Sequence, residues 1–375
     1  MLQWNELRRA LKRANKNIWN LVKLEGKKDS ERLQVTIMSD TWEIGLYDLY
    51  CKLETDVDVC IDAVELDKLL GYIKDIPTIS AKTESEVKEE YVGTKVSGES
   101  TTKNVKHYTD TITLSGGGRN IETKSYHEGW DYSTECFTEK VKDSAKITEE
   151  DWDIILKAKG YAYEDESRKI LNGVCLHPKY IAGTDGRRLY VHKNNIQLSD
   201  EEAPVIDVPR LFFNKKKLQR IEITEKYFRL IGDGFVIAKR KSEGTFPNFF
   251  SVMPDNEIYT EKFDITKEVY DLCQLVIKLD GPQLNFKTQE HLLADVKATS
   301  ETKEYRTIIA SNKHKDNQAG IELTYNAQFI SQAYKDGFRV INYAIDKEKN
   351  KAAIRPAKLT SNIQGEYMYL MPMSE

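Results

Sequence analysis

The stretch Glu164–His192 reads EDESRKILNGVCLHPKYIAGTDGRRLYVH and is the most patterned part of the chain. An Arg and a Leu-x-Gly precede an apolar, strand-like run, and the motif T-D-G-R-R-L then begins at Thr184. Asp-Gly favours a turn because glycine adopts positive φ without a steric penalty. The stretch therefore predicts a strand followed by a turn.

Six segments along the chain carry a helix-start signal followed by apolar residues at i, i+3, i+4 and i+7. These signals lie at Gln3, Asp62, Thr148, Asp207, Thr266 and Asn326. Glu65 completes a capping box with the second signal, and Pro209 stands just inside the fourth segment. The successive intervals are about 59, 86, 59, 59 and 60 residues, so a helix with several strands is predicted to repeat.

The one long interval contains a Ser/Thr/Lys/Glu-rich run, about residues 80–108, with few apolar residues to bury. Removing about 27 residues there restores the period, so we expect an insertion that is either a disordered loop or an added contact surface. Strand-like alternations lie between the predicted helices, and glycine turns at 116–118 and 232–234 punctuate them. The clearest alternations are Leu33-Val35-Ile37, Ile112-Leu114 and Val236-Ala238.

Six units of helix plus antiparallel strands predict an α+β fold of three pseudo-equivalent domains with two units each. A length of 375 residues also exceeds what one hydrophobic core usually organises. The predicted domains are 1–145, which carries the insertion, 146–254 and 255–375. Coincidence remains the alternative, because any α+β protein has helix caps.

Composition predicts a folded, cytoplasmic protein with 40% hydrophobic and 31% charged residues. We find no long uncharged apolar stretch and no signal-peptide pattern. The five cysteines are scattered without zinc-ligand spacing, so we expect reduced, mostly buried thiols and no bound metal or cofactor. They are Cys51, Cys60, Cys136, Cys175 and Cys273.

Basic residues recur on the predicted helices although the net charge is −4. The first helix is expected to bury an apolar stripe made of Trp4, Leu7, Leu11, Ala14, Ile18 and Leu21. Another face of it holds Arg8, Arg9, Lys12, Arg13 and Lys16, and the other helices add Lys68, Lys74, Lys157, Lys159, Arg210, Lys215, Lys267 and Lys335. Such a face would bind phosphates without regard to base sequence, so we expect it to contact double-stranded DNA. For any single lysine the alternative is a side chain that is simply solvated.

Catalytic signatures are missing from the sequence. It contains no G-x-x-x-x-G-K-[ST], G-x-S-x-G, H-E-x-x-H or C-x-x-C motif, and its six histidines do not cluster. Gly116–Gly118 fits a hairpin turn better than a phosphate cradle. Asp56, Asp58 and Asp62 fit an exposed strand end better than a cation site. These patterns favour a binding protein over an enzyme.

The stretch Glu164–His192 resembles the middle domain of the bacterial DNA polymerase III beta subunit, the DNA sliding clamp. Three further landmarks of that family follow in order across more than half the chain. They are Val208-Pro209-Arg210, the run from Glu243 through Pro247 to Val252-Met253-Pro254, and the terminal Leu370-Met371-Pro372-Met373. The first 145 residues resemble the family less, mainly around residues 62–74 and 112–121.

This resemblance implies a non-catalytic processivity factor. Two copies would associate head to tail, and their six domains would close into a ring around double-stranded DNA. The first domain of one subunit would meet the third domain of the other. Twelve helices at roughly 10 Å spacing would leave a hole roughly 28 Å wide, enough for a duplex. Implied partners are the catalytic subunit of DNA polymerase III, the clamp loader and other proteins with clamp-binding peptides. No membrane association is expected.

In the family, partner peptides with a Gln and apolar anchors enter a pocket between the middle and last domains. Matched by motif, the pocket would be lined by Leu171, Thr184, Gly186, Arg187, Arg188, Leu189, Pro247, Val252, Tyr369, Met371, Pro372 and Met373. Simple core packing of a last strand is the alternative for the two methionines. Arg187 stands where many relatives have His, so peptide preference is expected to differ.

Two other functions stay open at this point. A clamp-fold interaction protein would bind polymerase or repair peptides without encircling DNA. An enzyme acting through scattered carboxylates is the less favoured alternative, and a cluster of desolvated acids in one cleft would support it.

Overall fold

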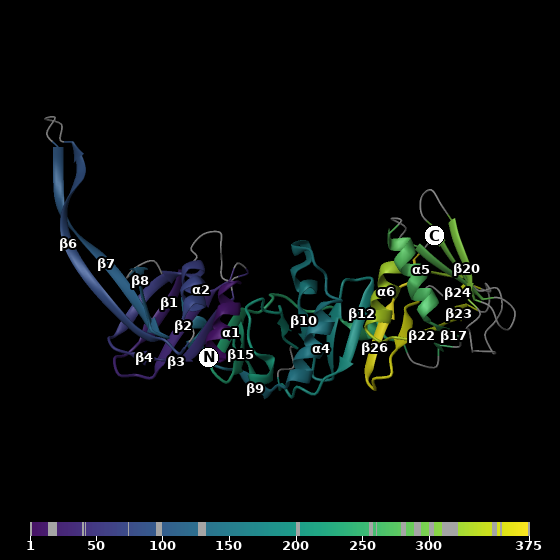
Figure 1. The fold of residues 1–375 in the computed structure, drawn as a ribbon. Helices are drawn as coiled ribbons and strands as arrows, with labels where there is room; N and C mark the ends of the chain where they lie inside the picture. Colours follow the sequence, from purple (N-terminus) through teal and green to yellow (C-terminus); the bar gives the residue numbers. More distant parts are fainter. Residues whose placement is uncertain are drawn as a thin grey trace. The chain divides into compact units, whose positions relative to one another are not determined.

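The protein, seen in a computed structural model, forms two compact units (Figure 1). Unit 1 comprises Met1–Trp152 and Pro209–Lys241, and unit 2 comprises Asp153–Val208 and Ser242–Glu375. The three-domain division stays a prediction. The structure describes residues 2–13, 21–39, 41, 43–73, 75–94, 100–126, 133–199, 203–254, 258–259, 261–278, 283–288, 294–299, 304–309, 322–346, 351–352 and 355–373.

Five of the six predicted helices are confirmed. They are α1 (Leu2–Leu11), α2 (Ala63–Tyr72), α4 (Glu149–Lys159), α5 (Lys267–Lys278) and α6 (Ala327–Lys335), and a short α3 (Glu135–Thr138) was not predicted. The expected caps also form: Asp62 Oδ1 accepts from the Glu65 N–H at 2.8 Å. Asn326 Oδ1 accepts from the Gln328 N–H at 2.8 Å. Local side-chain chemistry therefore sets these helix starts.

The helix predicted after Asp207 is wrong. That segment runs without helix up to a 3₁₀ turn at Lys215–Lys217. Distant groups bind its backbone instead, since buried Glu43 accepts from the N–H groups of Arg210 and Leu211. The Asp207 carboxylate, which was expected to cap the helix, pairs with Lys159 instead. Arg210 and Lys215 consequently do not lie on an α-helix.

The first predicted helix ends earlier than its apolar pattern suggested. Trp4, Leu7 and Leu11 are buried as expected, but α1 stops at Leu11. Leu21 begins strand β1 instead of extending the helical stripe, so that part of the prediction is wrong. Ala14, Lys16 and Ile18 lie outside the described residues.

Unit 1 contains an eight-stranded sheet of order β5-β1-β2-β3-β16-β15-β14-β9 and a four-stranded sheet of order β4-β6-β7-β8. The strands of the first are β1 (Leu21–Gly26), β2 (Arg32–Met38), β3 (Ile44–Tyr50), β5 (Val57–Asp62), β9 (Asp143–Lys146), β14 (Leu218–Ile223), β15 (Tyr227–Gly232) and β16 (Phe235–Arg240). Those of the second are β4 (Lys52–Leu53), β6 (Thr78–Thr94), β7 (Ser100–Gly116) and β8 (Arg119–Ser125). All three predicted alternations lie in these strands, which confirms them.

Unit 2 repeats the same plan, with sheets of order β13-β10-β11-β12-β26-β25-β22-β17 and β20-β19-β18-β21. The first comprises β10 (Val174–Leu176), β11 (Tyr180–Thr184), β12 (Arg188–Lys193), β13 (Val205–Ile206), β17 (Glu261–Asp264), β22 (Val340–Tyr343), β25 (Ala357–Thr360) and β26 (Glu366–Leu370). The second comprises β18 (Gln283–Thr288), β19 (Ala294–Thr299), β20 (Glu304–Ile309) and β21 (Glu322–Asn326). A small ribbon pairs β23 (Ile345–Asp346) with β24 (Lys351–Ala352).

Each eight-stranded sheet consists of two four-stranded halves joined edge to edge. In unit 1 the joint is β3 with β16, and in unit 2 it is β12 with β26. Every joining strand is the last of an antiparallel three-strand meander, such as β14-β15-β16. The remaining meanders end at β8 and β20, which lie at sheet edges. The repeat predicted from helix spacing is therefore visible as six four-stranded sets.

The insertion forms a long hairpin rather than a disordered loop. Strands β6 and β7 pair continuously from Thr78↔Ser115 to Thr94↔Ser100. From the pair Glu84↔Thr109 to the pair Thr94↔Ser100, in the part of the chain that the structure describes, these strands pair only with each other. A rise of about 3.3 Å per residue makes this ribbon roughly 36 Å long. Figure 1 shows it extending past the other strands of unit 1.

All five cysteines are buried free thiols, as expected. Burial raises the pKa of Cys175 to about 12 and that of Cys136 to about 11, so these thiols stay protonated at neutral pH. Among the described residues, no helix is both long enough and apolar enough to cross a membrane.

Candidate functional site

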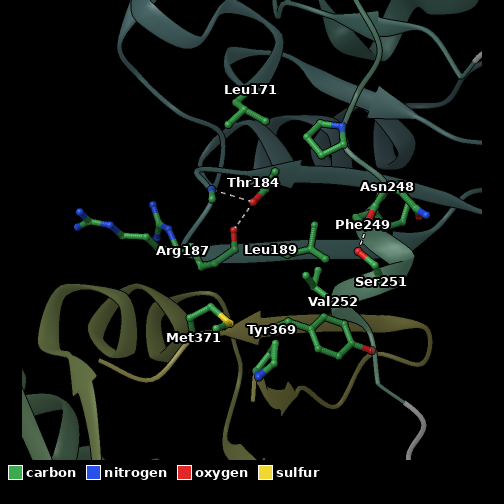
Figure 2. A pocket seen from close by; sticks show the side chains of 14 residues that line it. Leu171, Thr184, Arg187, Leu189, Asn248, Phe249, Ser251, Val252, Tyr369 and Met371 are labelled. Carbon is green, nitrogen blue, oxygen red and sulfur yellow. Dashed lines mark hydrogen bonds between the residues drawn. The ribbon is translucent and has the colours of Figure 1, made fainter. Parts of the chain in front are cut away.

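A cavity of about 210 Å³ opens in unit 2 (Figure 2). Five separate segments build it. They are the end of the 3₁₀ helix η1 (Glu166–Asn172), the β11–β12 turn with the start of β12, the 3₁₀ helix η3 (Phe249–Val252) with the two residues before it, Pro356 just before β25, and β26 with the residues after it. It is lined by Leu171, Thr184, Gly186, Arg187, Arg188, Leu189, Pro247, Asn248, Phe249, Ser251, Val252, Pro356, Tyr369 and Met371. Aliphatic and aromatic side chains form most of this lining, which favours an apolar ligand.

The β11–β12 turn gives the cavity a rigid polar edge. Thr184 Oγ1 donates to the Arg188 carbonyl at 2.6 Å and accepts from the Gly186 N–H at 3.1 Å. Asp185 Oδ1 accepts from the N–H groups of Arg187 and Arg188 at 2.9 and 3.0 Å. Gly186 has φ +86°, where other residues would be strained. The T-D-G motif thus closes a turn through its own side chains.

The rest of the wall comes from η3 and from β26 with the residues after it, which adjoin the turn through the Met371 N–H and the Arg187 carbonyl. Asn248 caps η3 by accepting from the Phe250 N–H at 3.2 Å, and Ser251 Oγ donates to the Asn248 carbonyl at 2.7 Å. Tyr369 packs in the apolar cluster beneath the cavity, and burial raises the pKa of its phenol so that it stays neutral. Met371 is 39% exposed, so this methionine lines the opening and is not core.

Ten of the twelve residues predicted from the sequence line this cavity. The two that do not are Pro372 and Met373, and the Met373 N–H donates to the Thr324 carbonyl at 2.8 Å. Sequence reasoning missed Asn248, Phe249, Ser251 and Pro356. Three of these follow Pro247 directly and could have been found from that landmark. Pro356 has no sequence signal and is brought to the cavity by the fold.

The structure divides the predicted DNA-facing residues into three groups. Those that are exposed and have no ion pair within the described part of the chain are Arg9, Lys12, Arg13, Lys68, Arg210 and Lys335. Those that form ion pairs are Arg8 with Asp67, Lys157 with Glu366, Lys159 with Asp207, Lys215 with Glu149 and Lys267 with Asp271. Lys16 and Lys74 lie outside the described residues. A role in DNA binding stays a prediction for all of them.

The other sites weighed from the sequence have structural explanations. Gly117 and Gly118 adopt positive φ in the turn between β7 and β8. Asp56 pairs with Lys27 and accepts from the Lys28 N–H, Asp58 pairs with Lys23, and Asp62 caps α2. Within the described residues, no group of three or more His, Cys, Asp or Glu is placed to hold a metal ion.

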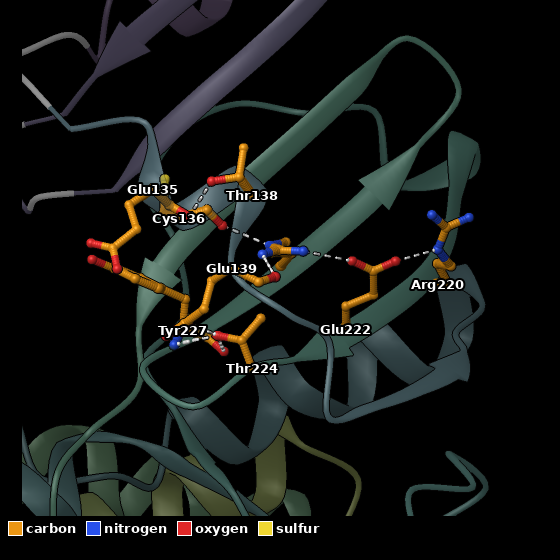
Figure 3. Close-up of polar contacts among 9 residues, drawn as sticks. Glu135, Cys136, Thr138, Glu139, Arg220, Glu222, Thr224 and Tyr227 are labelled. Atoms are coloured by element: carbon orange, nitrogen blue, oxygen red, sulfur yellow. Dashed lines mark hydrogen bonds and ion pairs between the residues drawn. The ribbon is translucent and has the colours of Figure 1, made fainter.

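One cluster of buried charges in unit 1 fixes the segment 135–139 against the sheet (Figure 3). Arg229 donates to the Cys136 carbonyl at 2.6 Å and to the Glu139 carbonyl. Glu222 pairs with Arg229 at 3.2 Å through one oxygen and with Arg220 at 2.9 Å through the other. Since both carboxylate oxygens are engaged, this cluster suits a structural role.

No protein-family model and no curated protein sequence matches the chain. Solved structures do match over nearly its whole length, and these are DNA polymerase III beta subunit clamps. The beta clamp of Helicobacter pylori, bound to a DNA ligase peptide, is 13% identical with a TM-score of 0.70, covering 99% of this chain and 97% of that one.

Two further beta subunits give the same result. The one from Borrelia burgdorferi, in complex with a natural product, is 15% identical with a TM-score of 0.71, covering 99% of this chain and 96% of that one. The one from Thermotoga maritima is 13% identical with a TM-score of 0.70, covering 100% and 97%. The chain therefore has the sliding-clamp fold of DNA polymerase III beta subunits along its full length.

Proposed function

We propose that this chain is a DNA sliding clamp: a non-catalytic processivity factor that encircles duplex DNA and tethers a polymerase. The observation that carries the proposal is the cavity of unit 2, which gathers ten residues matched by motif to the partner-peptide pocket of clamps. This cavity lies in a chain that has the clamp fold throughout. The Helicobacter pylori clamp binds a DNA ligase peptide, which supports a peptide as the ligand here.

The chemistry of the cavity suits the apolar anchors of a peptide. Burying aromatic and aliphatic anchors in a preformed pocket supplies most of the binding energy at such sites. Met371 can adapt to different anchors because its side chain is unbranched and polarisable. Replacing Met371 by Ala is therefore expected to weaken a Gln-containing clamp-binding peptide about tenfold, measured by fluorescence polarisation, and to leave the oligomeric state unchanged.

The repeat of the sheets supports ring closure. Both joined sheets connect the last strands of two meanders, and β8 and β20 are the corresponding strands left at edges. We expect β8 of one copy to pair with β20 of a second copy, which would form further eight-stranded sheets and close two open edges per interface. A head-to-tail dimer results, and it should be visible by light scattering at micromolar concentration. A stable monomer there would contradict the proposal.

Comparing circular with linear DNA tests whether the protein is topologically linked to the duplex. Loaded by a clamp loader onto nicked circular DNA, the protein should remain bound, and it should run off once the circle is linearised. Equal retention on both forms would sink the encircling function. Reversing charge at Arg9, Lys12 and Arg13 should greatly reduce loading, because these exposed cations would contact phosphates. Reversing the exposed Lys27 and Lys52 serves as the matched control.

A second candidate is a clamp-fold protein that captures polymerase or repair peptides without encircling DNA. The ion pairs of Lys157 and Lys159 favour it, because their charges are already balanced within unit 2. Under this alternative the charge reversal at Arg9, Lys12 and Arg13 leaves every activity unchanged, while Met371→Ala still weakens peptide binding. The two functions are therefore separable by one set of variants.

A further inference from the structure

We propose that the long hairpin formed by β6 and β7 is an arm that packs against a second copy of this chain, beside the β19–β20 end of that copy, and stabilises the dimer. This inference rests on the proposed function, because it uses the expected pairing of β8 with β20 of a second copy. It goes beyond that pairing by giving the insertion a role and a partner.

The outer part of the hairpin has no partner strand within the described residues of its own chain. Strand β8 covers one edge of β7 only as far as Asp110, and β4 pairs with β6 only at Thr78 and Ile79. From the pair Glu84↔Thr109 outward the two strands pair only with each other. A two-stranded ribbon is marginally stable by itself in water, and its open edges can pair with other chains. We therefore expect this ribbon to rest on another surface.

The joined sheet of unit 1 shows what lies beside such a hairpin connection. Strands β3 and β16 pair in antiparallel orientation, and β16 ends the meander β14-β15-β16. Tyr227, the first residue of β15, packs against a buried cluster that contains Met38 and Ile44. Met38 ends β2 and Ile44 begins β3. The connection between the first two strands of one meander thus contacts the turn before the last strand of the other.

The joined sheet of unit 2 repeats this contact. Strands β12 and β26 pair in antiparallel orientation, and β26 ends the meander β22-β25-β26. Pro356, which lies just before β25, lines the same cavity as Gly186 and Arg187 of the β11–β12 turn. The cause is general, because antiparallel pairing of two last strands brings these two connections to the same end of the joined sheet.

The same geometry would bring the hairpin next to a second copy. Strands β8 and β20 also end meanders, so their antiparallel pairing would place the β6–β7 connection of one copy at the β19–β20 end of the other, where Thr299 pairs with Glu304. In unit 1 the connection in this place runs only from Ile223 to Tyr227. The ribbon of β6 and β7 instead continues for roughly 36 Å. This extra length is available to extend the contact between the copies.

Double-stranded DNA fits the hairpin less well than a second copy does. The paired segments 84–94 and 100–109 contain four glutamates and three lysines, so their net charge is negative. A surface that binds phosphates neutralises them with an excess of lysine and arginine. The charge of the hairpin therefore favours a protein surface as the partner.

The first test shortens the hairpin. Replacing residues 85–108 by Asn-Gly leaves Glu84 and Thr109 joined by a two-residue loop of a type that suits hairpins. Light scattering over a dilution series should show that the dissociation constant of the dimer rises about tenfold relative to the full-length protein. Circular dichroism and the affinity of the unit 2 cavity for a clamp-binding peptide are the controls, and both should stay unchanged.

The second test keeps the full-length chain and probes the contact itself. In the double variant Lys106→Cys/Glu304→Cys, a bis-maleimide that spans about 10 Å, or two strand spacings, should link two copies into a covalent dimer. The native cysteines are all buried, so they should react little. Lys106→Cys/Lys335→Cys is the matched control, because Lys335 lies on α6 away from the expected interface, and it should give no covalent dimer.

Both results together support the inference. An unchanged dissociation constant on shortening, in a full-length protein that is a dimer, would overturn the arm and leave the pairing of β8 with β20 in place. A weaker dimer without the Lys106–Glu304 cross-link would also overturn the arm, because shortening would then act through the fold of unit 1. A monomeric full-length protein would overturn the proposed ring as well.

Discussion

Helix α1 with the turn after it and the last turn of α4 both carry basic residues at close spacing, yet the two regions use them differently. Arg9, Lys12 and Arg13 are exposed. Lys157 Nζ instead lies 2.5 Å from Glu366 Oε1 and donates to the Asp336 carbonyl at 2.7 Å, and Lys159 pairs with Asp207. The same sequence pattern thus yields a solvated cationic surface in one region and internal cross-links in the other.

The largest expected effect is at Lys157. Replacing it by Met leaves Glu366, whose side chain is 1% exposed, as a buried charge without its cation. We expect the free energy of unfolding to fall by about 3 kcal/mol in urea denaturation. Adding Glu366→Gln should recover part of this loss, and Lys335→Met on α6 should change little. An unchanged unfolding midpoint for Lys157→Met would remove the contrast between the two regions.

A smaller effect is expected at Arg188, which repeats the contrast inside the cavity. Arg188→Gln loses the ion pair with Asp185 and the bond to Gly160, so the free energy of unfolding should fall by about 1.5 kcal/mol. Arg187→Gln should lie within about 0.5 kcal/mol of the wild type because its side chain is exposed. Equal losses for the two variants would show that Arg187 also has an internal partner.

Asp207 tests the weaker of the two cross-links of α4. Lys159 keeps its contacts with Asn172 when Asp207 is changed to Asn, and the ion pair is partly exposed. We therefore expect a loss of about 0.5 to 1 kcal/mol in the free energy of unfolding. A loss as large as that of Lys157→Met would mean that the pair is more strongly desolvated than its exposure indicates.

The smallest effect on stability is expected for the α1 region. Reversing Lys12 and Arg13 to Glu should change the free energy of unfolding by less than about 0.5 kcal/mol, because both side chains are exposed. Including Arg9→Glu would also remove its contact with the Phe212 ring, worth about 0.5 kcal/mol or more. A large loss from the Lys12 and Arg13 pair alone would place them among the internal cross-links.

Much of the fold was predictable because its signals are local. Asp62, Thr148 and Asn326 cap helices with their own side chains, as their sequence patterns indicated. Asp207 shows the same kind of pattern, but its carboxylate pairs with Lys159 and Glu43 binds the backbone that follows. The competing partners lie far away in the sequence, so no local pattern could reveal them.

The insertion shows a similar limit. Its polar composition predicted no core, and the choice between disorder and a contact surface stayed open. The structure pairs β6 with β7 along their whole length, which satisfies the backbone of the hairpin through its own two strands. Period-2 alternation was too weak in this segment to indicate strands, although the pairing itself is local.

By itself the sequence determined five of the six predicted helices and the clearest strands, because caps, turns and apolar periodicity act over a few neighbouring residues. Most of the residues around the cavity followed from the resemblance to a known family. Tertiary structure alone decided that Lys157, Lys159 and Arg188 are internal while Arg9 and Arg187 are exposed. The physical reason is that a cation's role depends on whether a carboxylate or carbonyl comes within a few ångströms of it. For Lys157 and Lys159 the carboxylate comes from a residue distant in the chain, whereas Arg188 pairs with Asp185 in its own turn and reaches the distant Gly160 carbonyl as well.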